Sequence, residues 1–142
     1  LRLLASHFPV VLPIHPRTRE SFRRFGFLDV LAATPGIHLV EPMGYFDFIG
    51  LAEPCKVVVT DSGGIQEETT YLKVPCLTLR ENSERPSTIS LGTNLLIGSD
   101  LGRLSSELET ISAGKFKRGA VPPLWDGRTA ERIVADLEEF LA

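Results

Sequence analysis

The sequence has 142 residues, which is the size of a single domain. Hydrophobic residues make up 43% and charged residues 23%, so the chain can bury a core and is not a disordered tail. The net charge is −3 and there is no run of lysines or arginines, which argues against binding nucleic acid or a membrane surface. No apolar stretch approaches the roughly 18 residues of a membrane-spanning helix. These features predict a soluble acidic domain.

The two cysteines, Cys55 and Cys76, have neither CxxC spacing nor metal-ligating neighbours, so we expect no metal site. Cys76 opens an apolar run and is typical of a small buried side chain. We interpret both cysteines as reduced, structural residues, which favours a cytoplasmic protein. The sequence begins with helical spacing but no capping residue, so we expect it to be part of a longer protein.

Apolar runs and helical periodicities alternate along the chain. Five short apolar runs predict strands, at residues 10–14, 37–40, 57–59, 76–79 and 94–97. Helical spacing predicts helices at residues 1–8, 17–27, 45–52, 64–72, 101–112 and 130–141. Short apolar strands separated by helices predict an α/β fold with a doubly wound parallel sheet.

The last helix is the clearest element of the sequence. Its apolar residues recur on one face and its charged residues occupy the other, so we expect it to dock on the domain, with Asp126 as its cap. The segment before it, residues 114–123, contains no such periodicity and is interpreted as a loose connector.

Residues suited to ligand binding follow several of the predicted strands. His15 follows the first strand, residues 41–48 the second, Asp61-Ser62-Gly63-Gly64 the third, and residues 80–85 the fourth. In an open α/β sheet the ligand lies outside the carboxyl ends of the strands, so these residues would line one edge.

The paired glycines open a predicted helix, where free N–H groups and the helix dipole suit a phosphate. Ser62 adds a hydroxyl, although a tight turn without a ligand would have the same spacing. Glu67 and Glu68 are expected in the first helical turn, where the dipole favours them, and at most one would face a pocket. His15, between two prolines, suits an acid or a phosphate donor, or a purely structural role.

The run Thr60 to Glu68, followed by Leu79-Arg80, Glu84-Arg85-Pro86 and Gly92-Thr93, closely resembles the non-hydrolysing UDP-N-acetylglucosamine 2-epimerases. The resemblance covers the chain in order from about Val10 to its end. It implies a two-domain fold of the glycosyltransferase-B type, of which residues 1–142 would be the C-terminal, Rossmann-like, nucleotide-sugar-binding domain. It further implies an isomerase of cell-envelope polysaccharide biosynthesis that uses no cofactor and is commonly a homodimer.

Members of this family interconvert UDP-GlcNAc and UDP-ManNAc by eliminating UDP and adding it back. The resemblance therefore implies that Ser62, Gly63 and Gly64 hold the diphosphate and that Glu68 holds the ribose. It places Phe48 against the uracil and Arg85 near the phosphates, and it makes His15 the residue that assists departure of UDP.

The carboxylates that move the C2 proton belong to the N-terminal half of the family's enzymes, so we expect this chain alone to be inactive. Met43 stands where many members have a glutamine near the uracil. Three other interpretations remain open: a hydrolysing relative that releases free N-acetylmannosamine, a glycosyltransferase of the same fold, and a UDP-sugar-binding module without chemistry.

Overall fold

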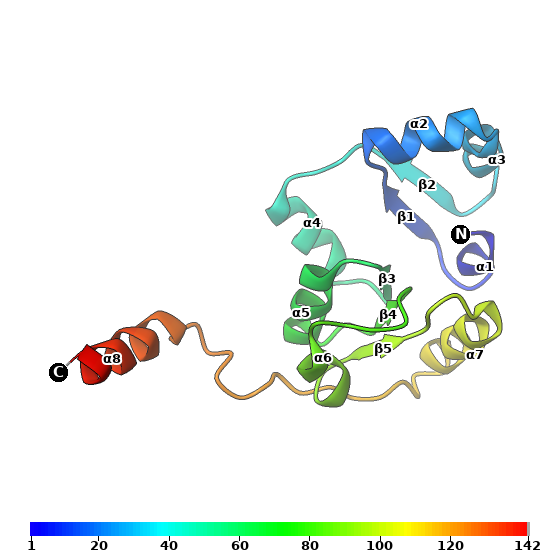
Figure 1. Cartoon of the computed structure of the whole chain (residues 1–142). Helices are drawn as coiled ribbons and strands as arrows, with labels where there is room; N and C mark the ends of the chain where they lie inside the picture. Colours follow the sequence, from blue (N-terminus) through cyan, green and yellow to red (C-terminus); the bar gives the residue numbers. More distant parts are fainter. Residues whose placement is uncertain (142) are drawn as a thin grey trace. The chain divides into compact units, whose positions relative to one another are not determined.

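In the computed structural model, which describes residues 1–141, helices alternate with parallel strands (Figure 1). The helices are α1 (Arg2–Ala5), α2 (Pro16–Arg24), α3 (Phe27–Ala32), α4 (Tyr45–Ala52), α5 (Gly63–Leu72), α6 (Pro86–Ser90), α7 (Leu101–Ser112) and α8 (Thr129–Leu141). The strands are β1 (Val10–Pro13), β2 (Ile37–Val40), β3 (Val58–Thr60), β4 (Cys76–Thr78) and β5 (Asn94–Leu96). The predicted α/β class with parallel strands is confirmed.

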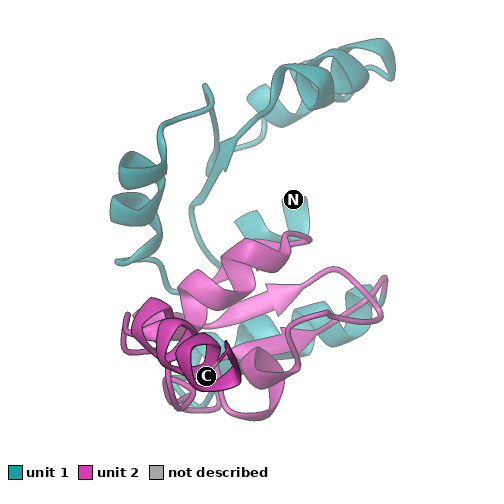
Figure 2. Ribbon diagram, turned by 60° about the vertical axis from the view of Figure 1, so that its left-hand side comes forward, with its two compact units in different colours: residues 1–56, 100–116 teal, residues 57–99, 117–142 magenta. Residues whose placement is uncertain are grey.

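The chain divides into two compact units, which Figure 2 shows in different colours. Unit 1 comprises residues 1–56 and 100–116, and unit 2 comprises residues 57–99 and 117–142. The strands divide with them, because β1 and β2 form a two-stranded sheet while β3, β4 and β5 form a three-stranded one.

Unit 1 is built around the parallel pair of β1 and β2, whose register places Val10 opposite Ile37 and Pro13 opposite Val40. Helix α3 packs against both α2 and β2. The buried apolar side chains of this unit are Ile14, Leu31, Ile37, Ala52, Leu104, Leu108 and Ile111.

The segment predicted as one helix over residues 17–27 is instead two helices, α2 and α3. Gly26 separates them with φ of 70°, a left-handed conformation that glycine adopts without a Cβ penalty. Because of this turn, Phe22 meets the ring of Phe27 edge-on at 6.5 Å, while Phe25 is exposed. The prediction was wrong because aromatic spacing continued across a glycine that ends the helix.

Unit 2 is a parallel sheet in the order β3-β4-β5, with Thr60 opposite Thr78 and Thr78 opposite Leu96. Helix α5 packs against all three strands, and α6 packs against α5 and β5. The central strand β4 is entirely buried, as its continuous apolar run predicts for a parallel sheet.

Both cysteines are free, as predicted, and Cys76 lies completely buried at the start of β4. Burial raises the pKa of the Cys76 thiol, and burial also raises the pKa of Cys55. A raised pKa keeps a thiol protonated at neutral pH, so both behave as small apolar side chains rather than nucleophiles.

Within the connector predicted at residues 114–123, the part from Lys117 onward is attached to unit 2, which the sequence did not predict. The ammonium of Lys117 donates to the carbonyl of Ile89 at 2.7 Å, and the N–H of Ala120 donates to the carbonyl of Leu91 at 2.8 Å. A Cβ at Gly119 would lie 2.7 Å from the backbone nitrogen of Thr93, so only glycine allows this approach. Backbone hydrogen bonds leave no periodic signal in side chains, so the segment resembled a loose connector.

Helix α8 forms as predicted, but its apolar face does not dock in the described structure. Its large apolar side chains are half or more exposed: Ile133, Val134, Leu137, Phe140 and Leu141. Periodicity identifies the side chains that share a face, and it does not identify the surface that would cover them. No helix in residues 1–141 is long and apolar enough to cross a membrane.

Asp126, the expected cap, lies three residues before α8 begins at Thr129. Its carboxylate accepts the N–H of Arg128 at 3.1 Å and pairs with the side chain of Arg132. The Arg132 side chain and the Arg128 N–H hold the pKa of the Asp126 carboxyl below its usual value. The residue thus links the turn at Gly127 to the first turn of the helix.

We expect Gly92→Ala to lower the free energy of unfolding by about 1–3 kcal/mol, because the site is closed on two sides. A Cβ at Gly92 would lie 2.6 Å from the methyl carbon of Thr70 and 2.6 Å from the backbone oxygen of Thr88. Urea unfolding measures the change. Gly50→Ala in α4 is the control, since a Cβ there meets nothing within 4 Å. Equal losses in the two variants would contradict the packing argument.

Candidate functional site

The carboxyl ends of β3, β4 and β5 meet at one edge of the sheet in unit 2, because the three strands are parallel and in register. Residues 61–64 follow β3, residues 79–85 follow β4, and residues 97–99 follow β5. Ligands of open α/β sheets bind at this edge. The candidate site therefore lies at this edge of the sheet.

Ser62, Gly63 and Gly64 form the turn from β3 into α5. Ser62 is the N-cap residue of α5, and its side chain makes no capping hydrogen bond. Its backbone N–H donates to the hydroxyl of Thr60 at 3.0 Å, which fixes the turn to the end of β3. The first N–H groups of a helix have no partner within the helix, and here the cap side chain does not take them. This end of α5 therefore presents N–H donors, the positive end of the dipole and a free hydroxyl.

The carboxylate of Glu84 lies beside this turn, which the sequence did not predict. A Cβ at Gly63 would lie 2.6 Å from Oε1 of Glu84. Nη1 of Arg80 donates to Oε1 of the same carboxylate at 3.3 Å and lies 3.1 Å from Oε2. The N–H of Glu84 itself and the Arg80 guanidinium hold the pKa of this carboxyl below its usual value, so it is ionised at neutral pH. An anionic group thus already lies at the N-terminus of α5.

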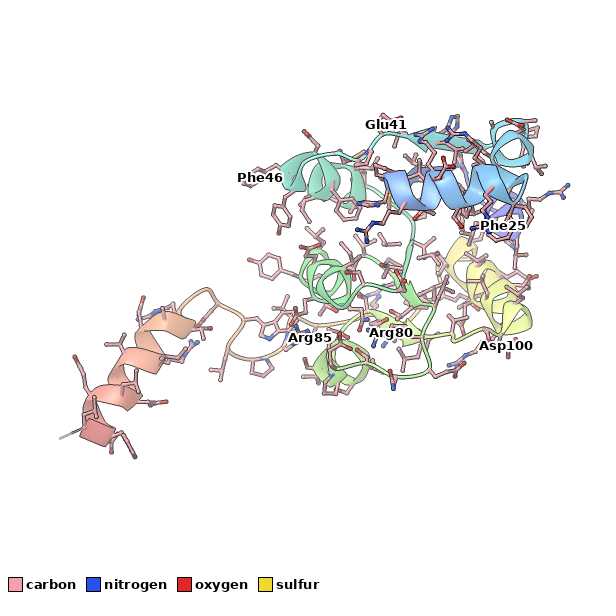
Figure 3. All side chains as sticks on the ribbon, turned by 45° about the horizontal axis from the view of Figure 1, so that its top comes forward. Phe25, Glu41, Phe46, Arg80, Arg85 and Asp100 are labelled. Carbon is pink, nitrogen blue, oxygen red and sulfur yellow. The ribbon has the colours of Figure 1, made fainter. Side chains whose placement is uncertain are left out.

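Arg85 is the N-cap residue of α6, and its side chain reaches back to α5. Its Nε lies 3.3 Å from Oε1 of Glu67, and both side chains are close to half exposed. Figure 3 labels Arg80 and Arg85, which the same loop carries from the end of β4 to the start of α6. The loop therefore supplies two guanidinium groups, and each is paired with a glutamate.

Glu68 follows Glu67 on α5 and is partly buried. Its Oε2 is buried and has no hydrogen-bond partner among the described residues. The first turn of α5 holds no acidic residue, because the helix starts at Gly63, so the expected dipole role of Glu67 and Glu68 is wrong. Only Glu67 pairs with Arg85, which leaves Glu68 as an acceptor that a hydroxyl donor would satisfy.

His15 belongs to unit 1, where it follows β1 and is the N-cap residue of α2. Its Nδ1 accepts the backbone N–H of Arg17 at 3.3 Å, and Pro16 occupies the first helical position. In the neutral ring an accepting Nδ1 leaves the proton on Nε2. The imidazole is exposed, so that N–H is available as a donor.

Phe48 also belongs to unit 1 and lies on α4, partly buried. Tyr45 and Phe46 on the same helix are exposed and meet edge-on at 5.6 Å between ring centres. Met43 precedes the helix and is partly buried. The structure thus places five of the seven predicted site residues in unit 2, and it places His15 and Phe48 in unit 1.

A buried polar cluster beneath the site was missed in the sequence. Four of its members have fully buried side chains, Gln66, Thr78, Thr88 and Asn94, and the fifth, Ser83, is partly buried. The available signal was polar residues inside short apolar runs, such as Thr78 and Asn94. Among residues 1–141, no group of three or more His, Cys, Asp or Glu residues could hold a metal ion.

Comparison with known proteins gives one consistent result. The family model for UDP-N-acetylglucosamine 2-epimerase matches residues 1–138. A Methanocaldococcus jannaschii protein named UDP-N-acetylglucosamine 2-epimerase is 42% identical over 125 residues, covering 88% of this chain and 34% of that protein. A Pseudomonas aeruginosa protein named UDP-2,3-diacetamido-2,3-dideoxy-D-glucuronate 2-epimerase is 37% identical, covering 94% and 35%. The chain spans about a third of the length of these curated relatives.

Solved structures give the same match. The crystal structure of the Methanocaldococcus jannaschii UDP-GlcNAc 2-epimerase in complex with UDP-GlcNAc and UDP has a TM-score of 0.79 at 40% identity. It covers 91% of this chain, which in turn covers 35% of that chain. The Neisseria meningitidis UDP-GlcNAc 2-epimerase bound to UDP-GlcNAc has a TM-score of 0.73 at 29% identity, with the same coverage.

Proposed function

Because the chain belongs to the UDP-N-acetylglucosamine 2-epimerase family of isomerases, we propose that residues 1–142 are the C-terminal, nucleotide-sugar-binding domain of a longer two-domain enzyme. In this proposal the enzyme interconverts UDP-GlcNAc and UDP-ManNAc without net hydrolysis. The enzyme is expected to be a homodimer, and its free, buried cysteine fits the reducing conditions of the cytoplasm.

The N-terminus of α5 is the observation that carries this proposal. Its free helix N–H groups and the uncommitted hydroxyl of Ser62 suit the diphosphate of a UDP-sugar. Gly64 would let that diphosphate approach the backbone closely, because a Cβ there would meet no described atom nearer than Oγ of Ser62 at 4.0 Å, apart from its own helix. At Gly63 the diphosphate would take the place of the Glu84 carboxylate. Arg85, in the loop beside the turn, adds a cation for the same group.

Two further contacts complete the binding of UDP in this proposal. Glu68 would accept hydrogen bonds from the ribose hydroxyls, which is supported by its buried oxygen without a partner. Phe48 would lie against the uracil ring, where an aromatic face offers stacking rather than hydrogen bonds.

His15 would assist the departure of UDP. A base outside this chain takes the proton from C2, the electron pair forms the C1–C2 double bond of a glycal, and the bond from C1 to the phosphate oxygen breaks. The N–H at Nε2 of His15 then donates to the charge that develops on that oxygen. Addition of UDP to C1 and of a proton to the opposite face of C2 completes the epimerisation.

The experiment that tests the function uses the full-length enzyme with UDP-GlcNAc in deuterated water, followed by proton NMR. We expect deuterium at C2 and UDP-ManNAc with the sugar still attached to UDP. Residues 1–142 expressed alone should give no exchange, because the proton-transferring carboxylates are expected in the N-terminal half.

Free ManNAc together with UDP would instead assign the protein to the hydrolysing relatives. Binding of UDP without exchange and without product would remove the epimerase proposal and leave a transferase or a binding module.

Ser62→Ala separates ligand binding from folding. Because the Ser62 hydroxyl caps no N–H group, we expect the free energy of unfolding to change by less than about 0.5 kcal/mol. The dissociation constant for UDP should rise about tenfold, since a hydrogen bond to a charged phosphate is lost. Isothermal titration calorimetry measures it, with the exposed Ser112→Ala as the control. An unchanged affinity in the Ser62 variant would contradict a phosphate contact.

Glu84→Gln should strengthen UDP binding by a factor of about three to five at low salt. The substitution removes the negative charge beside Gly63, where the diphosphate would bind, and it frees Arg80 from its carboxylate partner. The matched control is Glu81→Gln in the same loop, whose carboxylate lies against Gly98. Weaker binding in the Glu84 variant, or equal gains in both, would exclude competition at the helix N-terminus.

A further inference from the structure

The buried polar cluster beneath the site is joined into one hydrogen-bond network that ends on the backbone of Arg85. We propose that Gln66 and Asn94 are positioning residues, which fix Arg85 for its contact with the diphosphate by holding its backbone through Ser83 and Thr88. This inference rests on the proposed binding of UDP by Arg85.

Asn94, at the start of β5, is the centre of the network. Its Nδ2 donates to Oε1 of Gln66 at 3.0 Å and to the hydroxyl of Thr88 at 3.1 Å. Its Oδ1 accepts the hydroxyl of Thr78 at 2.6 Å. Both amide hydrogens and the carbonyl oxygen of Asn94 are therefore hydrogen-bonded, and this pattern of donors and acceptors fits only one orientation of the amide.

Two hydroxyls connect this centre to Arg85. The N–H of Arg85 donates to the hydroxyl of Ser83 at 3.0 Å, so the single hydrogen of Ser83 is left to donate to Oε1 of Gln66. The hydroxyl of Thr88 accepts from Asn94 and donates its hydrogen to the carbonyl of Arg85 at 2.7 Å. The backbone N–H of Arg85 is thus connected through Ser83 to Gln66, and its carbonyl is connected through Thr88 to Asn94.

The position of Gln66 on α5 gives the network its functional consequence. The preceding turn is the glycine turn at Gly63 and Gly64, and the next residue, Glu67, pairs with the Arg85 side chain. One helix therefore holds the backbone of Arg85 from its buried face and the guanidinium from its exposed face. Arg85 is fixed relative to the same N–H groups that would bind the diphosphate.

A purely structural role would not require this arrangement. Gln66, Thr88 and Asn94 are fully buried, where polar groups are unfavourable unless they are paired. Nε2 of Gln66 is buried without a partner among the described residues, so the side chain is not the best choice for stability alone. An apolar side chain of similar size would avoid that unpaired group, but it would leave Ser83 and Asn94 without their acceptor.

The test is a double-mutant cycle in the full-length enzyme, with the dissociation constant for UDP measured by calorimetry and folding monitored by the melting temperature. The variants are Gln66→Met, Arg85→Ala and the two combined. Arg85→Ala should weaken UDP binding about 10- to 100-fold. Gln66→Met should weaken it about five- to tenfold in the wild-type background and by less than about twofold in the Arg85→Ala background.

A second set of variants keeps the test decisive if Gln66→Met does not fold. Thr88→Val removes the hydroxyl that links Asn94 to Arg85 and should weaken UDP binding. Thr88→Ser keeps the hydroxyl and should bind UDP with the wild-type affinity. The matched control is Thr93→Val, a buried threonine whose hydroxyl donates to the carbonyl of Thr69 at 3.3 Å and has no link to Arg85.

The outcomes separate the inference from the function on which it rests. If Arg85→Ala leaves UDP affinity unchanged, the proposed role of Arg85 is wrong, and the inference is wrong with it. If Arg85→Ala weakens binding but Gln66→Met acts equally in both backgrounds, the network has only a structural role. Equal losses for Thr88→Val and Thr93→Val would likewise overturn the positioning role.

Discussion

The parallel arrangement of β3, β4 and β5 is the constraint on which the candidate site depends. Parallel strands in register send every following loop to the same edge of the sheet, so the turn after β3 and the loop after β4 meet there. Helix α5 packs across all three strands, which fixes the direction in which its N-terminus points. Backbone pairing therefore brings the glycine turn and the two arginines to the same edge of the sheet.

The interior of unit 2 contains many polar side chains, and this polarity has a structural cause. The strands β3, β4 and β5 have only three residues each, so most of the chain between them is loop and helix. The loops therefore require hydrogen bonds to the interior to hold their position. Thr78 and Asn94 on the strands bond to each other, and Asn94 also donates to the hydroxyl of Thr88. That hydroxyl in turn donates to the backbone carbonyl of Arg85, which connects the loop to the interior. Gly119 serves the same end differently, because it lets the connector lie directly on Gly92 and Thr93, just before β5.

The sequence predicts the fold well where a signal is local. Apolar runs and periodicity predict the strands, α4 and α7, and the paired glycines predict the glycine turn at Gly63 and Gly64. The break at Gly26 depends on a backbone angle, and no apolar periodicity predicts the short helix α6, which begins at Pro86. Glu84 beside Gly63 and the Gln66–Asn94 pair join residues far apart in sequence, and no single-sequence pattern records such pairings.

The electrostatics of the site follow from the same geometry. Each loop arginine has a glutamate partner, Arg80 with Glu84 and Arg85 with Glu67, and both pairs are substantially exposed to solvent. Exposed pairs of this kind contribute little to stability, so exchanging a carboxylate for a phosphate on either arginine would require little free energy. In the proposed complex the diphosphate would carry more charge than one carboxylate and would also reach the helix N–H groups. The two glutamates would then keep the arginines in place without binding them tightly enough to exclude the nucleotide.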